Sequence, residues 1–220
     1  MECASDYTYV KADTTGLTDK ESNVSFSIKD AVEGDVVPGS TTIKFKQRWL
    51  TKDSEIYNHG LAQFCAQFSM IGYSDSCYGK NVSITTETDL KKALKSVDFE
   101  LVDIGMNTGR DEVNYFIATR QGLDIETNEV FDVIFVGLIG SHKDQWYSDF
   151  DPWGKESKKG LREGNIHVGF EDAKKYVYDK LFNYMDGKYD GNYPDNIKFI
   201  ITGHSRGAAA ANLLGKQLID

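Results

Sequence analysis

Residues 197–211 read I-K-F-I-I-T-G-H-S-R-G-A-A-A-A, and this stretch decides the fold. Ile197 to Thr202 is mostly apolar and carries one charge, Lys198, as in a buried strand. G-H-S-R-G follows at once, and the four alanines after it favour a helix small enough to lie tightly on a sheet. This order is typical of a nucleophile elbow, a sharp strand-to-helix turn that lifts the central hydroxyl clear of the sheet. We therefore predict that Ser205 is a catalytic nucleophile.

The residues around Ser205 suit that role. Gly203 and Gly207 let the backbone pass close to its neighbours. A serine nucleophile needs a base to take its proton and donors to hold the oxyanion. The backbone N–H of Arg206, the next residue, supplies one donor. We expect Ser141 to supply the other, through its N–H and its hydroxyl, because it follows the buried strand predicted at 129–138.

Hydrophobic periodicity predicts the remaining elements. The expected strands are Thr41 to Leu50, Phe99 to Met106, Glu112 to Arg120 and Glu129 to Leu138, and the expected helices are Ser54 to Ile71, Asp89 to Val97 and Phe170 to Met185. Strands alternating with helices in the second half predict a parallel sheet covered by helices, with the hairpin at 99–120 adding antiparallel strands at one edge. Residues 1–40 are polar, and we expect an exposed leader or a peripheral strand there.

Composition and charge narrow the function classes. Acidic residues outnumber basic ones, 34 to 25, so the net charge of −9 argues against a nucleic-acid partner, which needs a dense positive surface. The longest apolar run, 133–140, is too short to cross a bilayer as a helix. No basic start with an apolar stretch opens the chain, so we expect no secretory signal and favour the cytoplasm. Cys3, Cys65 and Cys77 form neither a disulfide framework nor a metal site.

Three stretches of the chain resemble the class 3 lipases, the fungal-lipase-like α/β-hydrolases. Residues 200–214, I-I-T-G-H-S-R-G-A-A-A-A-N-L-L, are similar to the family's apolar strand followed by G-H-S-x-G-[GA]-A. Residues 133–141, V-I-F-V-G-L-I-G-S, are similar to its strand followed by R-G-[TS], with Ile139 in place of the arginine. Residues 167–170, H-V-G-F, are similar to its H-x-G-F ahead of a helix. The resemblance covers about Tyr57 to the C-terminus.

The resemblance implies an α/β-hydrolase fold, with a mostly parallel sheet and flanking helices. Residues 41–220 would be the N-terminal portion of that domain, with the C-terminal strands missing. The implied activity is hydrolysis of acylglycerols or related lipid esters, including those at a lipid–water interface, without a metal or an organic cofactor. Residues 142–150 fall where such lipases often keep a lid. Trp146, Tyr147 and Phe150 are its candidate apolar residues, the alternative being that they are core residues.

The expected triad is incomplete in this sequence. α/β-Hydrolases present serine, then a carboxylate, then histidine, but no histidine follows Ser205 and the only later carboxylate is Asp220. The histidines that precede Ser205 are His59, His142, His167 and His204. We expect His204 to point away from the nucleophile, His167 and His59 to be structural, and His142 to approach Ser205 only if its loop closes. The simplest interpretation is a class 3 lipase whose acid and base lie beyond Asp220.

Two other hypotheses remain open. The same machinery would serve on a phospholipid or a thioester. A non-catalytic, hydrolase-like protein that binds a lipid or a partner would also account for the missing acid and base, although the well-formed elbow disfavours it.

We predict that residues 1–220 alone hydrolyse esters weakly and dissolve poorly. Loss of the base removes most of the chemistry, and the apolar strand Ile197 to Thr202 would form an exposed sheet edge that promotes aggregation. Monomer yield and nitrophenyl-ester hydrolysis, measured for this chain and for one extended past Asp220, test both effects. Equal activity and yield would contradict the prediction and make His142 or His167 the base.

Overall fold

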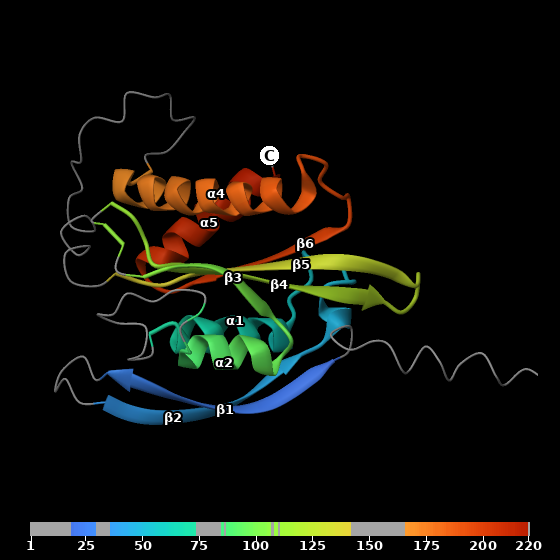
Figure 1. Cartoon of the computed structure of the whole chain (residues 1–220), viewed down its shortest axis with the longest axis horizontal. Helices are drawn as coiled ribbons and strands as arrows, with labels where there is room; N and C mark the ends of the chain where they lie inside the picture. Colours follow the sequence, from blue (N-terminus) through green and yellow to red (C-terminus); the bar gives the residue numbers. More distant parts are fainter. Residues whose placement is uncertain are drawn as a thin grey trace, which may run out of the picture.

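A four-stranded sheet in the order β3-β4-β5-β6 forms the centre of the protein (Figure 1). Its strands are β3 (Glu100–Gly105), β4 (Tyr115–Asp124), β5 (Glu129–Leu138) and β6 (Ile197–Gly203). This computed structural model describes residues 19–29, 36–73, 85, 87–106, 108–109, 111–141 and 166–219.

The pairing within this sheet is mixed. β3 with β4 and β4 with β5 are antiparallel, whereas β5 and β6 are parallel, with Leu138 opposite Gly203. The expectation of a mostly parallel sheet is therefore corrected for the described strands. The physical reason is the length of the connections. Short turns join antiparallel neighbours, whereas a parallel pair requires a longer crossover. Among the described elements of this sheet, a helix lies in the connection between β5 and β6.

Both faces of the sheet are buried, and alternate residues of each strand feed two separate cores. Along β5, Val133 and Phe135 face one core, whereas Ile134 and Val136 face the other. This period of two is the ordinary consequence of strand geometry. A strand buried on both faces is continuously apolar, which explains why the sequence alone predicted the bounds of β5 correctly.

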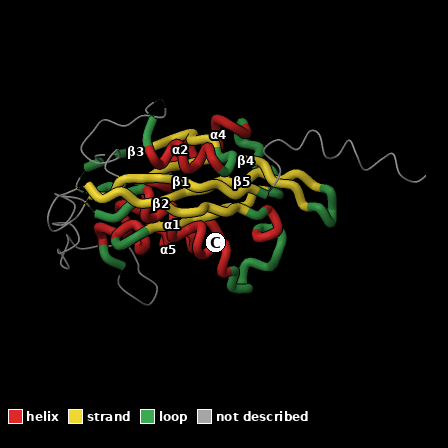
Figure 2. Tube along the Cα trace, turned by 90° about the horizontal axis from the view of Figure 1, so that it is seen from below, coloured by secondary structure: helices red, strands yellow, loops and turns green. Residues whose placement is uncertain are grey.

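Helices cover the two faces in separate layers (Figure 1). α4 (Val168–Tyr189) and α5 (Arg206–Ile219) lie on one face, and α1 (His59–Ile71) and α2 (Asp89–Ser96) lie on the other. A hairpin of β1 (Lys20–Lys29) and β2 (Val36–Phe45) packs against α1 and α2, and Figure 2 shows it from below. A 3-10 turn, Gln47–Trp49, follows β2. None of the described helices is long and apolar enough to span a bilayer.

Several predicted bounds are corrected by local contacts. The predicted strand Thr41 to Leu50 begins earlier, as β2, and ends at Phe45 because the 3-10 turn follows. α1 starts five residues after Ser54, because the side chain of Asn58 accepts the Leu61 N–H and caps the helix there.

The other corrections concern β4 and α4. β4 starts at Tyr115 and not at Glu112, because Asn114 turns its side chain back to Thr108. α4 runs beyond Met185 to Tyr189, and Asp190 caps it with a left-handed φ of 51°.

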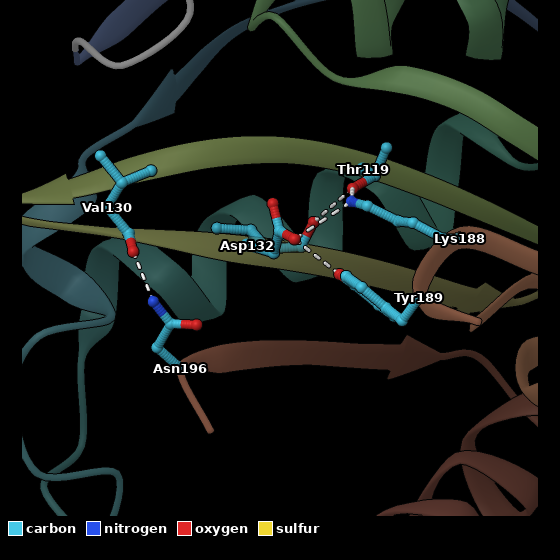
Figure 3. Close-up of polar contacts among 7 residues, drawn as sticks. Thr119, Val130, Asp132, Lys188, Tyr189 and Asn196 are labelled. Carbon is cyan, nitrogen blue, oxygen red and sulfur yellow. Dashed lines mark hydrogen bonds and ion pairs between the residues drawn. The ribbon is translucent and has the colours of Figure 1, made fainter. Parts of the chain in front are cut away.

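The C-terminal end of α4 is fastened to the start of β5 by a polar cluster (Figure 3). The Tyr189 hydroxyl donates to Asp132 Oδ2 at 2.7 Å, and Lys188 Nζ lies 3.3 Å from the same oxygen. Burial of the Tyr189 hydroxyl raises its pKa, and the hydrogen bond to the Asp132 carboxylate raises it further. Asn196 donates to the Val130 carbonyl beside them. The cluster fixes the helix at the end of the sheet opposite Leu138.

We predict that Phe135→Ala lowers the free energy of unfolding by about 3–5 kcal/mol, because a fully buried ring leaves a cavity. Its ring contacts those of Phe64, Phe68, Phe99 and Phe116. Urea denaturation measures the change. Val130→Ala on the same strand is the control, because Val130 is 42% exposed and should cost under about 0.5 kcal/mol. Equal losses in the two variants would show that Phe135 is not a core anchor.

Candidate active site

The turn between β6 and α5 has the geometry of a nucleophile elbow. β6 ends at Gly203, α5 begins at Arg206, and Ser205 between them has a φ of 54°. A left-handed φ is strained for a serine and is typical of functional turns. The Ser205 carbonyl accepts the N–H groups of Ala208 and Ala209, so the turn runs directly into the helix. The Ser205 side chain is exposed. The predicted strand-to-helix turn is confirmed.

Two glycines allow this turn to lie against the sheet. A Cβ on Gly203 would stand 2.3 Å from the Gly207 carbonyl oxygen, and a Cβ on Gly207 would stand 2.2 Å from the Leu138 carbonyl oxygen. Both contacts are with backbone, which cannot move aside as a flexible side chain can. The elbow therefore has no room for a side chain at either glycine.

The end of β5 lies beside the elbow. Leu138 pairs with Gly203, and the His204 N–H donates to the Leu138 carbonyl at 3.3 Å. A Cβ on Gly140 would stand 2.9 Å from the His204 carbonyl oxygen. Ser141, which follows Gly140 and is half-buried, thus belongs to a loop that runs along the elbow. Its oxyanion role stays a prediction.

Ile139 occupies the position at which the class 3 lipase pattern has an arginine. The loop around it packs without an arginine charge. Its side chain is 2% exposed, and its N–H donates to the Asn114 carbonyl at 2.7 Å. The Ile139 side chain also lies against Gly72, at the end of α1. Apolar packing holds the backbone just before Ser141.

Tyr73, which sequence reasoning missed, lies at the same place. Its hydroxyl and His204 Nδ1 are 2.9 Å apart, and its ring meets the imidazole edge to face. The hydroxyl also occupies the space that a side chain on Gly140 would need. Tyr73 and His204 are 131 positions apart, so no local pattern links them.

The described histidines have structural contacts that disfavour them as the base. His167 Nδ1 accepts the Gly169 N–H at 3.2 Å, so the neutral ring carries its proton on Nε2, which is buried. His204 contacts Tyr73 through Nδ1. His59 is exposed at the start of α1. The opposite end of this helix, at Ile71, is the end near the elbow, and the helix axis rises about 18 Å between the two residues.

Several predicted residues lie outside the described residues. They are His142, the lid candidates Trp146, Tyr147 and Phe150, and the carboxylate Asp220.

Cys65 is a structural residue of α1. Burial raises the pKa of its thiol to about 11, which a hydrogen bond with Thr202 only partly offsets. The thiol therefore stays protonated at neutral pH, and a thiolate is needed for nucleophilic attack. Among the described residues, no cluster of histidine, cysteine and carboxylate side chains could hold a metal ion.

Comparison with known protein families matches residues 133–220 to the family described as Lipase (class 3). The matched segment begins in β5 and includes α4, β6, the elbow and α5. No curated protein and no solved structure matches the chain.

We predict that Gly207→Ala destabilises the protein by about 1–3 kcal/mol, because the new methyl group collides with the Leu138 carbonyl. Gly187→Ala is the matched control, since it places the same methyl group in open space on α4. It should stabilise the helix by about 0.5–1 kcal/mol. Thermal unfolding of both variants tests this, and a Gly207→Ala protein as stable as the parent would refute the close approach.

Proposed function

From the match of residues 133–220 to the class 3 lipase family, we propose that the protein is a serine acyl-hydrolase acting on carboxylic esters of lipids. The observation that carries the proposal is the exposed Ser205, held with a φ of 54° between the strand β6 and the helix α5. A left-handed backbone costs free energy at a serine, and such strain is concentrated at functional sites.

The proposed reaction starts with attack of Ser205 Oγ on the ester carbonyl carbon. A base takes the hydroxyl proton, and the carbonyl oxygen becomes an oxyanion. The backbone N–H of Arg206 and the N–H and hydroxyl of Ser141 hold that oxyanion. The positive end of the α5 dipole favours negative charge at the same place. Collapse expels the alcohol, which receives the proton, and water then releases the acyl group from Ser205.

We assign the role of base to none of the described histidines, His59, His167 and His204. Residues 206–220 contain no histidine. His167 and His204 contact other groups through Nδ1, as described above.

A substrate panel separates the proposed lipid esters from related acyl compounds. Triacylglycerol, phospholipid and thioester substrates share the attack on a carbonyl carbon but differ in the leaving group. We propose the carboxylic esters because the matched family is one of lipases. Faster turnover of a phospholipid or a thioester than of an acylglycerol would redirect the assignment within acyl hydrolysis.

We predict that Ser205→Ala reduces p-nitrophenyl butyrate hydrolysis to the background rate and abolishes labelling by a fluorophosphonate probe. In the extended, active form of the chain, Ser141→Ala should lower kcat by about a hundredfold, as for the loss of one oxyanion donor. Ser40→Ala is the control, because Ser40 is exposed on the distant β2 strand. Hydrolysis unchanged in Ser205→Ala would refute the proposal and favour a lipid- or partner-binding protein. A Ser141→Ala rate equal to the parent's would restrict Ser141 to its backbone N–H.

A further inference from the structure

We propose that the Arg206 side chain is a positioning element of the elbow, which orients the Arg206 backbone N–H by anchoring it to the N-terminus of α4. The inference rests on the proposed function, in which this N–H holds the oxyanion. It adds a role for the guanidinium that the G-H-S-x-G pattern does not require, since the pattern leaves this position open.

The first observation is the burial of Arg206. Its side chain is 2% exposed, although it adjoins the exposed Ser205 in sequence. A buried guanidinium is costly unless hydrogen bonds compensate for the lost hydration. The other buried side chains of α5 include Ala210, Ala211 and Leu214, which are small or apolar. We therefore expect the guanidinium of Arg206 to form a specific hydrogen bond.

That contact is with the backbone of α4. Arg206 Nη2 donates to the Gly169 carbonyl oxygen at 2.9 Å, in a buried hydrogen bond across 37 positions of sequence. Gly169 is held from its other side as well, because its N–H donates to His167 Nδ1 at 3.2 Å. The His167 ring lies 4.6 Å from that of Phe170. The H-V-G-F stretch thus presents a fixed carbonyl to Arg206.

α4 is a firm anchor for this bond. Its side chains Ala173, Val177 and Leu181 are fully buried in the core beneath the helix. Its other end is bound to β5 through Tyr189 and Asp132. A carbonyl on such a helix has little freedom to move, so a guanidinium bound to it is fixed relative to the sheet.

Fixing the side chain of Arg206 restricts its backbone. The N–H and the guanidinium belong to one residue, so a pinned side chain narrows the range of φ and ψ at the first position of α5. Oxyanion donors act only when held within about 0.5 Å and 10–20° of the productive geometry. The strained φ of Ser205 next to it also needs support from its surroundings. The bond from Arg206 to Gly169 supplies support from the side opposite the sheet.

Variants at two buried arginines separate positioning from general stability. Arg120 is the matched control, because it is 5% exposed, lies among Phe45 and Phe99 on the other face of the sheet, and donates to the Val97 carbonyl at 2.8 Å. The experiment compares Arg206→Met, Arg206→Lys and Arg120→Met for kcat, KM and Tm with p-nitrophenyl butyrate.

Arg206→Met should lower kcat by about tenfold to a hundredfold with KM within about twofold of the parent, because the oxyanion forms only in the transition state. Arg206→Lys should recover at least half of this loss on a logarithmic scale, since one ammonium donor can replace one hydrogen bond to a carbonyl. Arg120→Met should lower Tm and leave kcat of the folded protein unchanged. A kcat of Arg206→Met equal to the parent's would overturn the inference, and so would an equal loss of kcat in Arg120→Met. The inference would also fail if Arg206→Lys lost as much kcat as Arg206→Met.

Hydrogen–deuterium exchange provides a readout that does not depend on hydrolysis. Arg206→Met should speed exchange of the amides at 168–171 and 206–209 together, and Arg120→Met should not. If Ser205→Ala hydrolyses the ester as fast as the parent does, the proposed function fails. Amide exchange then tests by itself whether the Arg206 side chain links the N-terminus of α5 to that of α4. Unchanged exchange at either segment in Arg206→Met would overturn the coupling.

Discussion

The close approach of the ends of β5 and β6 is the constraint on which the candidate site depends. Parallel strands in register bring their carboxyl ends to one edge of the sheet, where Leu138 meets Gly203. The His204 N–H then bonds to the Leu138 carbonyl, and Gly207 lies against that carbonyl with no space for a methyl group. A shift of one residue in this register would turn every side chain of β6 to the opposite face. The loop that carries Ser141 would then no longer run along the elbow.

The two cores of the protein support this edge in different ways. On the α1 and α2 side, phenylalanine rings fill the space and hold the sheet from beneath. On the other side, the alanines of α5 allow that helix to lie close to β5 and β6, which is the approach the elbow needs. Large aromatic side chains therefore pack on the α1 and α2 face of the sheet, and small side chains pack on the α5 face. Together they hold the strained turn at Ser205 in place. This division agrees with the requirement that strain be held by its surroundings.

The N-termini of α4 and α5 come together at the elbow. Each helix start carries a partial positive charge, which favours an anion nearby. The bond from Arg206 to Gly169 joins the two starts directly, and His167 caps α4 next to it. Tyr73 contacts His204 from the end of α1, so elements from both layers meet around Ser205. The two motifs of the second half, H-V-G-F and G-H-S-R-G, are therefore parts of one structural unit.

The sequence by itself determined the elements whose signal is local. The continuous apolar run of β5, the elbow between β6 and α5, and the β3–β4 hairpin follow from periodicity and from turn residues, and all three are present in the structure. It also located Ser205, because a strained turn requires small residues at fixed spacing. Only the tertiary structure decided the contacts of Tyr73 with His204 and of Arg206 with Gly169, which are 131 and 37 positions apart. Such contacts depend on how helices pack on a sheet, and a residue's neighbours along the chain carry no information about that packing.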